Sequence, residues 1–254
     1  MPVLDSRGKV VNLETLHSLL GRKTELPKVL IMAGGFGKRL KPITNKTPKP
    51  LLKIGSKSVL EVLIKKLINL GFFEFYLSVH YKHEMIKKYF GDGKKFGCKI
   101  DYLYEDSPLG TAGSLGLLSH FKVGENLLIL NSDLVTNVNF IELFKFHDFH
   151  QNDATMCVKQ YSHTVPYGIV NHSNFKLKEI IEKPKYNFFI NCGIYILSSK
   201  IVNKIKKPKY IDMPELLFKC SKNKKILIFP IHENWIDIGS IDDYKKAKSL
   251  ANKE

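Results

Sequence analysis

Residues 28–50, with the sequence KVLIMAGGFGKRLKPITNKTPKP, determine how the rest of the chain is interpreted. The stretch begins with an apolar run at 29–32 that is short enough for a buried strand. The turn AGGFG at 33–37 follows, where glycines permit positive φ angles and let an anion approach successive backbone N–H groups. A loop braced by prolines then carries a series of cations: Lys38, Arg39, Lys41, Lys46 and Lys49. This order of strand, glycine turn and basic loop predicts a polyphosphate-binding site.

Arg39 carries particular weight because arginine is rare in this chain. Of the 40 Lys and Arg residues, only Arg7, Arg22 and Arg39 are arginine. A guanidinium group grips phosphate with two parallel hydrogen bonds, which an ammonium group cannot do. The alternative is a tight turn followed by a solvated basic loop; glycines, arginine and proline-braced lysines together favour phosphate binding. The stretch is neither a Walker A loop, because Arg39 follows Lys38, nor a GxGxxG fingerprint, because Leu40 replaces the third glycine.

Length and composition indicate a globular α/β protein. A chain of 254 residues with 44% hydrophobic content can bury a full core. It contains no apolar run long enough to span a membrane and no signal peptide, so we expect no membrane partner. The four cysteines lie far apart without a CxxC pattern, which is typical of reduced thiols in a cytoplasmic protein.

The formal net charge of +16 raises nucleic-acid binding as an alternative function. The lysines are scattered along the chain, however, and no helix-turn-helix, RRM or zinc-finger pattern accompanies them. Anionic small substrates account for the charge equally well. We therefore expect no nucleic-acid partner.

Apolar strands alternate with helices from residue 28 onward. Ser58 and Glu61 form a capping box for a helix that Gly71 ends. The predicted strands lie at 51–54, 73–79, 98–104, 127–130, 155–158, 168–171, 188–197 and 226–231, and the predicted helices at 58–70, 83–90, 115–120, 140–150, 214–220 and from Ser240 onward. This alternation predicts an α/β fold with a Rossmann-like mixed, mostly parallel sheet and helices on both faces. Ligands of such sheets bind beyond the carboxyl ends of the strands.

Two aspartates are candidate metal ligands. Asp133 ends the apolar strand at 127–130, and Asp237 precedes the last predicted helix in the segment WIDIG. A lone aspartate at a strand end is usually a turn or cap residue. Two carboxylates that meet at a polyphosphate suit Mg²⁺, which binds one or two carboxylates together with phosphate oxygens.

A second glycine turn, EDSPLGTAG at 105–113, again leads from a strand toward a helix. Glu105 at its start offers only hydrogen-bond acceptors. Guanine presents two adjacent donors, N1–H and N2–H₂, whereas uracil and thymine present one donor between acceptors. Glu105 therefore favours guanine, with uracil or another base left open.

Several segments, in the expected order, resemble the sugar-phosphate nucleotidylyltransferase family. Residues 34–50 resemble its GGxGxRLxPLTxxxPKP signature, with Lys38 in place of threonine and Ile43 in place of leucine. The NSD segment ending at Asp133 and the WIDIGSIDDY segment around Asp237 resemble the family's two metal-binding motifs. The PLGTAG segment at 108–113 resembles the corresponding segment of the family's guanylyl branch. Residues 182–184 resemble the family's EKP motif, and Tyr167-Gly168 and Asn191-Cys192-Gly193 resemble its YG and NxG sugar contacts.

The resemblance implies a nucleotide-diphospho-sugar transferase fold and a set of site residues. The catalytic residues it implies are Arg39 on the departing pyrophosphate, Lys49 on the triphosphate, Lys183 on the incoming phosphate, and Asp133 and Asp237 on Mg²⁺. The nucleotide-binding residues are Ala33, Gly34, Gly35, Gly37, Glu105, Gly110 and Thr111. The sugar-binding residues are Gly168, Glu182 and Asn191.

The implied reaction is the attack of a sugar 1-phosphate on the α-phosphorus of a nucleoside triphosphate, with GTP favoured, and release of pyrophosphate. Uridylyl or other nucleotidyl transfer to a different sugar remains an alternative. A non-catalytic nucleotide-sensing protein on the same scaffold is another, although intact Arg39, Lys49, Asp133 and Asp237 argue against it. The subunit number stays open, and a homo-oligomer is possible.

Residues 1–26 differ in character from the rest. The sequence PVLDSRGKVVNLETLHSLL reads as a small hairpin followed by an amphipathic segment, and it resembles the closing hairpin and helix of a CBS repeat. We therefore expect residues 1–26 to be the remnant of a CBS-type regulatory domain with its linker, and residues 27–254 to be the catalytic domain. CBS-fused members resemble guanylyltransferases of legionaminic-acid-type pathways, which suggests glucosamine 1-phosphate as acceptor and GDP-glucosamine as product, with mannose and heptose 1-phosphate as alternatives.

Overall fold

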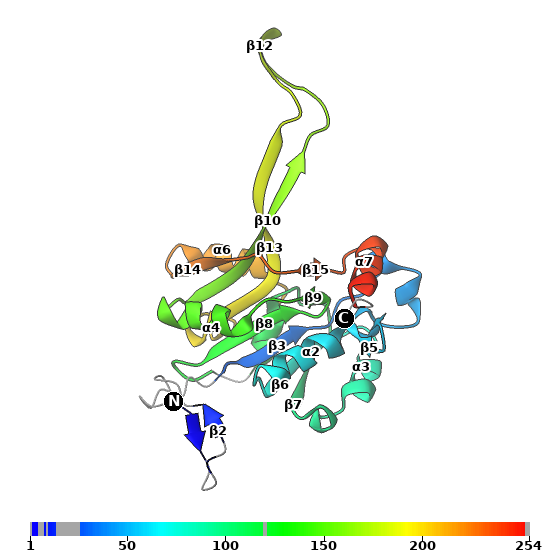
Figure 1. Cartoon of the computed structure of the whole chain (residues 1–254), viewed down its shortest axis with the longest axis vertical. Helices are drawn as coiled ribbons and strands as arrows, with labels where there is room; N and C mark the ends of the chain where they lie inside the picture. The colour runs from blue at the N-terminus through cyan, green and yellow to red at the C-terminus, as the bar shows by residue number, and fades with distance from the viewer. Residues whose placement is uncertain (1, 5–7, 9, 14–25, 119–120, 252–254) are drawn as a thin grey trace.

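The computed structural model describes residues 2–4, 8, 10–13, 26–118 and 121–251. Its centre is a seven-stranded sheet in the spatial order β14–β10–β13–β8–β3–β6–β7 (Figure 1). These strands are β3 (Lys28–Met32), β6 (Glu74–Val79), β7 (Lys99–Tyr104), β8 (Asn126–Asn131), β10 (Ala154–Thr164), β13 (Lys185–Ser198) and β14 (Ile226–Ile231). β13 is antiparallel to both of its neighbours, and every other neighbouring pair is parallel. The predicted mixed, mostly parallel sheet is confirmed.

Helices cover both faces of the sheet, as predicted. They are α2 (Val59–Asn69), α3 (His83–Phe90), α4 (Phe140–Phe149), α5 (Ser199–Val202), α6 (Met213–Ser221) and α7 (Ile241–Ala251). Because side chains alternate along a strand, the central strand β3 contributes to two cores. Val29 and Ile31 pack in one core with residues of α2 and α4, and Leu30 packs in the other with residues of α5 and α6.

Local signals fix the ends of α2. The Ser58 Oγ accepts a hydrogen bond from the Glu61 backbone N–H at 3.2 Å, which is the predicted cap. Gly71, with φ +95°, follows the end of the helix. A residue with a Cβ rarely takes that conformation, so the chain turns there toward β6.

The helix predicted at 115–120 is wrong over its described part. Residues Gly113–Leu117 form a single 3-10 turn, η5. The reason is packing: a Cβ on Gly113 would lie 2.0 Å from the Lys209 carbonyl oxygen, and one on Gly116 would lie 2.4 Å from the Lys207 carbonyl carbon. The glycines admit a neighbouring backbone segment, and glycine disfavours a continued helix.

β10 and β13 are longer than predicted and extend past the sheet as a two-stranded arm (Figure 1). Its outer part is the hairpin of β11 (Ile169–Ser173) and β12 (Lys176–Ile181), and β12 was not predicted. The apolar run used to predict β10 ends at Val158, and polar residues follow it. A strand outside the core needs no continuous apolar run, so its extension gave no signal.

At the N-terminus, β1 (Pro2–Leu4) pairs antiparallel with β2 (Val10–Leu13), which is the predicted hairpin. The amphipathic segment predicted after it lies outside the described residues, and the CBS interpretation stays a prediction. Among the helices of the described ranges, none combines the length and apolar character needed to cross a membrane.

Candidate active site

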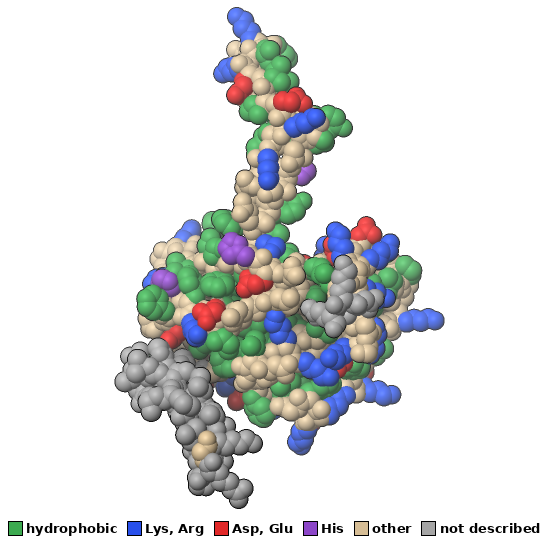
Figure 2. Space-filling model, in the orientation of Figure 1, with side chains coloured by type: hydrophobic (Ala, Val, Ile, Leu, Met, Phe, Trp, Pro, Cys, Tyr) green, Lys and Arg blue, Asp and Glu red, His purple; other side chains and the backbone are tan. Residues whose placement is uncertain are grey.

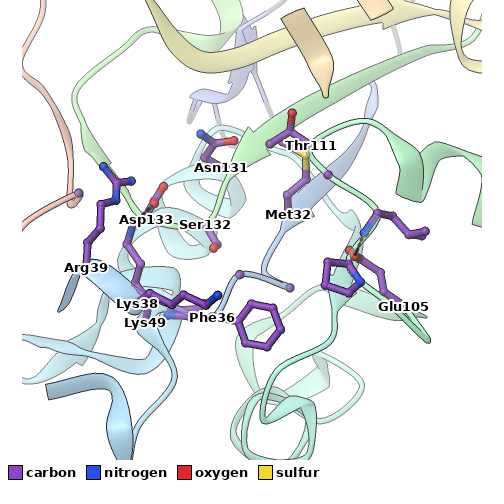
Figure 3. Close-up of a pocket in the computed structure, with 18 of the residues that line it drawn as sticks. Met32, Phe36, Lys38, Arg39, Lys49, Glu105, Thr111, Asn131, Ser132 and Asp133 are labelled. Carbon is purple, nitrogen blue, oxygen red and sulfur yellow. Dashed lines mark hydrogen bonds and ion pairs between the residues drawn. The ribbon is translucent and has the colours of Figure 1, made fainter. Parts of the chain in front are cut away.

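A cavity of about 420 Å³ opens at the carboxyl ends of β3 and β8 (Figure 3). Three segments bound most of it: Met32 at the end of β3 with residues 34–40 after it, residues 108–111 of the second glycine turn, and residues 131–133 at the end of β8. Many predicted site residues line it, namely Gly34, Gly35, Gly37, Arg39, Lys49, Glu105, Gly110, Thr111 and Asp133. The cavity therefore lies where ligands of such sheets bind.

The structure brings the two predicted metal ligands together. β15 (Trp235–Asp237) pairs antiparallel with β9 (Leu134–Thr136), which places Asp237 opposite Leu134. The Ile238 N–H also donates to the Asp133 carbonyl at 3.1 Å. Asp133 and Asp237, far apart in the chain, thereby reach one cation: the Lys49 ammonium pairs with Asp133 Oδ2 and lies 3.9 Å from Asp237 Oδ1.

The cluster of Asp133, Asp237 and Lys49 holds two carboxyl groups and one ammonium group. Burial, then the negative charge of Asp133, raises the pKa of the Asp237 carboxyl to about 6, although Lys49 and Arg39 oppose the shift. Oδ1 of Asp133 and Oδ1 of Asp237 are buried and have no hydrogen-bond partner among the described residues. Two buried carboxylate oxygens without hydrogen bonds suit Mg²⁺, which completes its shell with phosphate oxygens and water.

Arg39 lies in a turn that follows Gly37, and Gly239 leaves space for its guanidinium. Gly37 has φ +63° and precedes the 3-10 turn η1 (Lys38–Leu40), and its carbonyl accepts a hydrogen bond from Thr44 Oγ1 at 2.9 Å. A Cβ on Gly239 would lie 3.2 Å from the Arg39 Nη1. The guanidinium therefore lies against the backbone of the segment that carries Asp237, at the edge of the cavity (Figure 3).

At the other end of the cavity, Glu105 is held in place by the protein. Its Oε1 accepts a hydrogen bond from the Ser78 hydroxyl at 2.6 Å, and its Oε2 accepts one from the Leu109 N–H at 3.0 Å. Ser78 is fully buried. A Cβ on Gly34 would lie 3.0 Å from Glu105 Oε1, so glycine at that position leaves space for the carboxylate. Phe36 forms the adjacent wall (Figure 3).

Gly110 and Thr111 line the cavity but also fasten a neighbouring loop. A Cβ on Gly110 would lie 2.7 Å from the Ile211 carbonyl oxygen. Asp212 Oδ1 accepts hydrogen bonds from the Thr111 N–H at 3.1 Å and from its hydroxyl at 3.3 Å. This loop brings Tyr210 to the cavity, where its hydroxyl donates to Asp212 Oδ2 at 3.2 Å.

Not every predicted residue faces the cavity. Ala33 is buried and its N–H donates to the Ser78 carbonyl at 2.7 Å, so that N–H is already satisfied within the protein. Asn191 lies at the base of the arm, where its side chain bonds the Tyr195 hydroxyl and the Gly193 N–H. Asp237 meets the cavity through Lys49 and Arg39 rather than as a lining residue.

Gly168, Glu182 and Lys183 lie on the arm and do not line the cavity. The two motifs do meet each other: a Cβ on Gly168 would lie 2.8 Å from Glu182 Oε2. Lys183 has φ +45°, a conformation that residues with side chains rarely adopt. The arm brings the YG and EKP motifs together outside the cavity lining, and their sugar-binding role stays a prediction.

Lys38, one of the cations of the predicted polyphosphate-binding loop, also lines the cavity, and further lining residues were not predicted: Met32, Phe36, Asn131, Ser132 and Tyr210. Most of them are adjacent in sequence to predicted residues of the same turns, and this adjacency could have identified them. Tyr210 had no such signal, because its position depends on the packing of residues 207–211 against Gly110, Gly113 and Gly116.

The described residues thus combine a mixed α/β sheet with a glycine turn, a basic loop and paired carboxylates at one of its edges. The chain belongs to the nucleotidyl transferase family, whose model matches residues 28–254. The predicted family is thus confirmed.

Relatives and solved structures agree with this assignment. The chain is 32% identical over 230 residues to the mannose-1-phosphate guanylyltransferase catalytic subunit beta of Dictyostelium discoideum, covering 88% of this chain and 64% of that protein. It is 34% identical over 226 residues to probable mannose-1-phosphate guanylyltransferase 3 of Oryza sativa subsp. japonica, covering 85% of this chain and 62% of that protein. The chain therefore spans less than two thirds of these relatives.

Among solved structures, HddC from Yersinia pseudotuberculosis matches with a TM-score of 0.70 and 28% identity, covering 89% of this chain and 99% of that one. A structure of the same protein complexed with GMP-PN matches with a TM-score of 0.70 and 27% identity, with the same coverage. A putative glucose-1-phosphate thymidylyltransferase from Bacillus anthracis matches with a TM-score of 0.73 at 24% identity, covering 90% and 96% of the two chains, and shows the shared fold.

Proposed function

We propose that this chain transfers a nucleotidyl group from a nucleoside triphosphate to a sugar 1-phosphate, giving a nucleotide sugar and pyrophosphate. One observation carries the proposal: Asp133 and Asp237 converge on Lys49, with Arg39 packed beside them, at the edge of a cavity walled by the glycine turn. Membership of the nucleotidyl transferase family supports it.

The reaction demands alignment of two anions and little proton chemistry. A sugar 1-phosphate is already an anionic nucleophile, so no strong general base is required. The protein must hold two mutually repelling groups in line and neutralise the charge that develops. We assign Arg39 to the departing pyrophosphate. Lys49 lies beside the two carboxylates and would reduce their repulsion of the triphosphate.

Mg²⁺ is the cofactor we propose, held by Asp133 and Asp237. When bound, the ion would supply a Lewis acid that neutralises charge on the α-phosphate. The buried, unbonded Oδ1 atoms of both aspartates support this assignment. Removal of the ion by EDTA is expected to stop turnover.

Guanine is the base we propose. Glu105 offers acceptors only, and each of its oxygens spends one hydrogen bond on Ser78 or Leu109, which leaves lone pairs for the paired donors of guanine. The relatives named above are guanylyltransferases, which supports the same choice. Uridylyl transfer remains the alternative.

The acceptor sugar is proposed as glucosamine 1-phosphate, in line with the resemblance of the N-terminal residues to a CBS repeat, with GDP-glucosamine as product. Mannose 1-phosphate, which the names of the relatives favour, is the competing acceptor. On either sugar, Glu182 and Gly168 would contact the hydroxyl groups, and Lys183 would hold the phosphate.

A substrate matrix tests the proposal. Pyrophosphate release is measured for the four nucleoside triphosphates against glucosamine, mannose and heptose 1-phosphates, with Mg²⁺ and with EDTA. We expect release with GTP and one of the hexose 1-phosphates, and only with the metal. Release with UTP alone would reassign the base. Nucleotide binding without release in any combination would instead indicate a nucleotide-sensing protein.

A further inference from the structure

The positive charge of this chain can hold the phosphates of a nucleotide but not its base. The formal net charge is +16, and on the face that Figure 2 shows, lysine and arginine side chains lie over both the body and the arm. Such charge attracts every nucleoside triphosphate in the same way. The base is a flat ring system, and proteins hold bases of this kind against aromatic side chains.

Two aromatic residues of the described chain line the cavity, Phe36 and Tyr210. Phe36 belongs to the first glycine turn, and its side chain is 38% exposed. A single exposed apolar ring on a protein surface needs no explanation. This ring, however, lies in the cavity wall, in a turn whose neighbouring residues are glycines and cations, so its presence there calls for a reason.

The Phe36 ring is held by two neighbouring rings. Its centroid lies 5.5 Å from that of His80, with the planes at 85°, and 5.5 Å from that of Tyr81, with the planes at 46°. The His80 Nδ1 lies 2.7 Å from the Glu105 carbonyl oxygen, which can only accept, so Nδ1 donates this hydrogen bond. One residue therefore joins Phe36 to Glu105, and a ring held in place loses little freedom when a ligand binds.

The Lys38 ammonium lies over the same ring, 5.4 Å from its centroid. Lys38 also lines the cavity, so the ring face that it covers borders the cavity. No described carboxylate pairs with Lys38, whereas Asp133 pairs with Lys49. A cation–π contact is weak at an exposed site, and a phosphate is a stronger partner for an ammonium group. Lys38 is thus free to exchange the ring for an arriving phosphate.

We propose that the base of the nucleoside triphosphate stacks on Phe36, and that Lys38 turns from the ring to the phosphates as the base arrives. This inference rests on the proposed function, because it assigns further contacts to the same nucleotide. A base whose edge meets Glu105 turns its faces toward the adjacent walls, and Phe36 is one of these walls (Figure 3). A purine covers more of the ring than a pyrimidine does, so stacking adds to the preference for guanine.

Two variants separate the ring from the charge. Phe36→Leu keeps an apolar side chain without the flat ring, and Lys38→Met keeps the length of the side chain without the charge. Isothermal titration calorimetry of the full chain, with Mg²⁺ and without a sugar 1-phosphate, measures the binding of GTP, UTP and inorganic tripolyphosphate. Phe73→Leu is the matched control, because Phe73 is 59% exposed and lies outside the cavity lining.

The two variants should respond differently. Phe36→Leu should raise the Kd for GTP by about tenfold or more, as expected for the loss of one base–aromatic stack, and the Kd for UTP by less. Its Kd for tripolyphosphate should not change, because that ligand has no base. Lys38→Met should raise the Kd for tripolyphosphate and for GTP by a similar factor. Phe73→Leu should change none of these values.

Three outcomes would overturn the proposal. An unchanged Kd for GTP in Phe36→Leu would show that the ring does not hold the base. Equal losses for GTP and tripolyphosphate in Phe36→Leu would show that the ring supports the loop instead. Unchanged tripolyphosphate binding in Lys38→Met would show that Lys38 does not turn to the phosphates. Circular dichroism and thermal melting establish that each variant is folded.

The calorimetry also separates this inference from the proposed reaction. Wild-type protein that binds GTP with the expected losses in both variants, but releases no pyrophosphate in the substrate matrix, would refute the transfer reaction and support the stacking. Pyrophosphate release together with an unchanged Kd for GTP in Phe36→Leu would refute the stacking alone. Wild-type protein that binds no nucleotide would refute both.

Discussion

Replacing Asp237 with asparagine is expected to change activity and stability in opposite directions. Asp133 and Asp237 lie together with one lysine between them, and the pKa of Asp237 is raised to about 6 because burial and the charge of Asp133 disfavour its ionised form. In the metal-free protein at neutral pH, the second carboxylate is therefore a cost to folding. Asparagine removes its charge while Lys49 keeps Asp133 as a partner.

The size of the effect follows from the pKa shift. A folded-state pKa of about 6 against an ordinary value of 3.8 means that ionised Asp237 opposes folding above pH 6. The full shift converts to about 3 kcal/mol, which we reduce to about 1.5 kcal/mol because the side chain is 37% exposed. For a chain of this size that corresponds to a melting temperature higher by about 3–6 °C. Turnover should fall by about 10²–10³ because a proposed metal ligand is lost.

Differential scanning calorimetry in EDTA measures the stability term. The wild-type penalty grows as the pH rises from 3.8 to 6, so the variant should melt higher at pH 7.5 and equal to wild type near pH 4. Added Mg²⁺ should raise the melting temperature of the wild type more than that of the variant. Asp242→Asn is the matched control, because Asp242 is exposed and its ion pair among the described residues is with Lys245 at 3.5 Å.

A lower melting temperature for Asp237→Asn at pH 7.5 would refute the reasoning. It would mean that the attraction of Lys49 and Arg39 for Asp237 exceeds the cost of burial and of repulsion from Asp133. An Mg²⁺-induced stabilisation of equal size in both proteins would separately remove Asp237 from the proposed metal site.

Three further changes test other parts of the structure. Arg39→Ala should lower kcat by about 10²–10³ with an unchanged melting temperature. Lys46→Ala, a change at an exposed residue of the same loop, should leave both quantities unchanged. A near-normal kcat in Arg39→Ala would contradict the assignment of Arg39 to the pyrophosphate. Ser78→Ala deprives Glu105 of a 2.6 Å hydrogen bond and should lower kcat/KM for GTP by about tenfold relative to UTP, and equal losses for both nucleotides would contradict a role in base choice. Burial lowers the pKa of His147 to about 4 from 6.5, so the free energy of unfolding should fall by about 3 kcal/mol between pH 6.5 and pH 4 as the unfolded state takes up the proton; His147→Gln should flatten this part of the profile in urea titrations.

The sheet was predictable because its signals are local. Buried strands such as β8 are continuous apolar runs, and α2 begins and ends at a cap and a glycine that the sequence displays. The arm was not predictable in this way. Its strands hold no core-facing pattern, since each residue of the ribbon faces solvent on one side or the other, and the alternation of Tyr161, His163 and the polar residues between them becomes meaningful only once the partner strand is known.

The predicted site residues that follow strands of the central sheet and those on the arm also differ in how well the sequence predicts their positions. Asp133 and Arg39 sit in turns directly after strands, so their position at the carboxyl edge follows from the order of elements. Glu182 and Lys183 follow a strand that lies outside the sheet, and the edge rule says nothing about where they point. Tyr210 depends on one loop packing against another, which no periodic pattern encodes.

A glycine motif does not by itself show why each of its glycines is needed. A glycine can admit a ligand or a neighbouring part of the protein, and the sequence does not distinguish the two. At Gly34 the added Cβ would meet the carboxylate of Glu105, and at Gly113 the backbone of Lys209. At Gly35 it would meet nothing within 4 Å, although that residue lines the cavity. No described atom of the protein therefore requires glycine at Gly35, and we propose that the ligand does, while its neighbour Gly34 leaves space for Glu105, the residue that we propose reads the base.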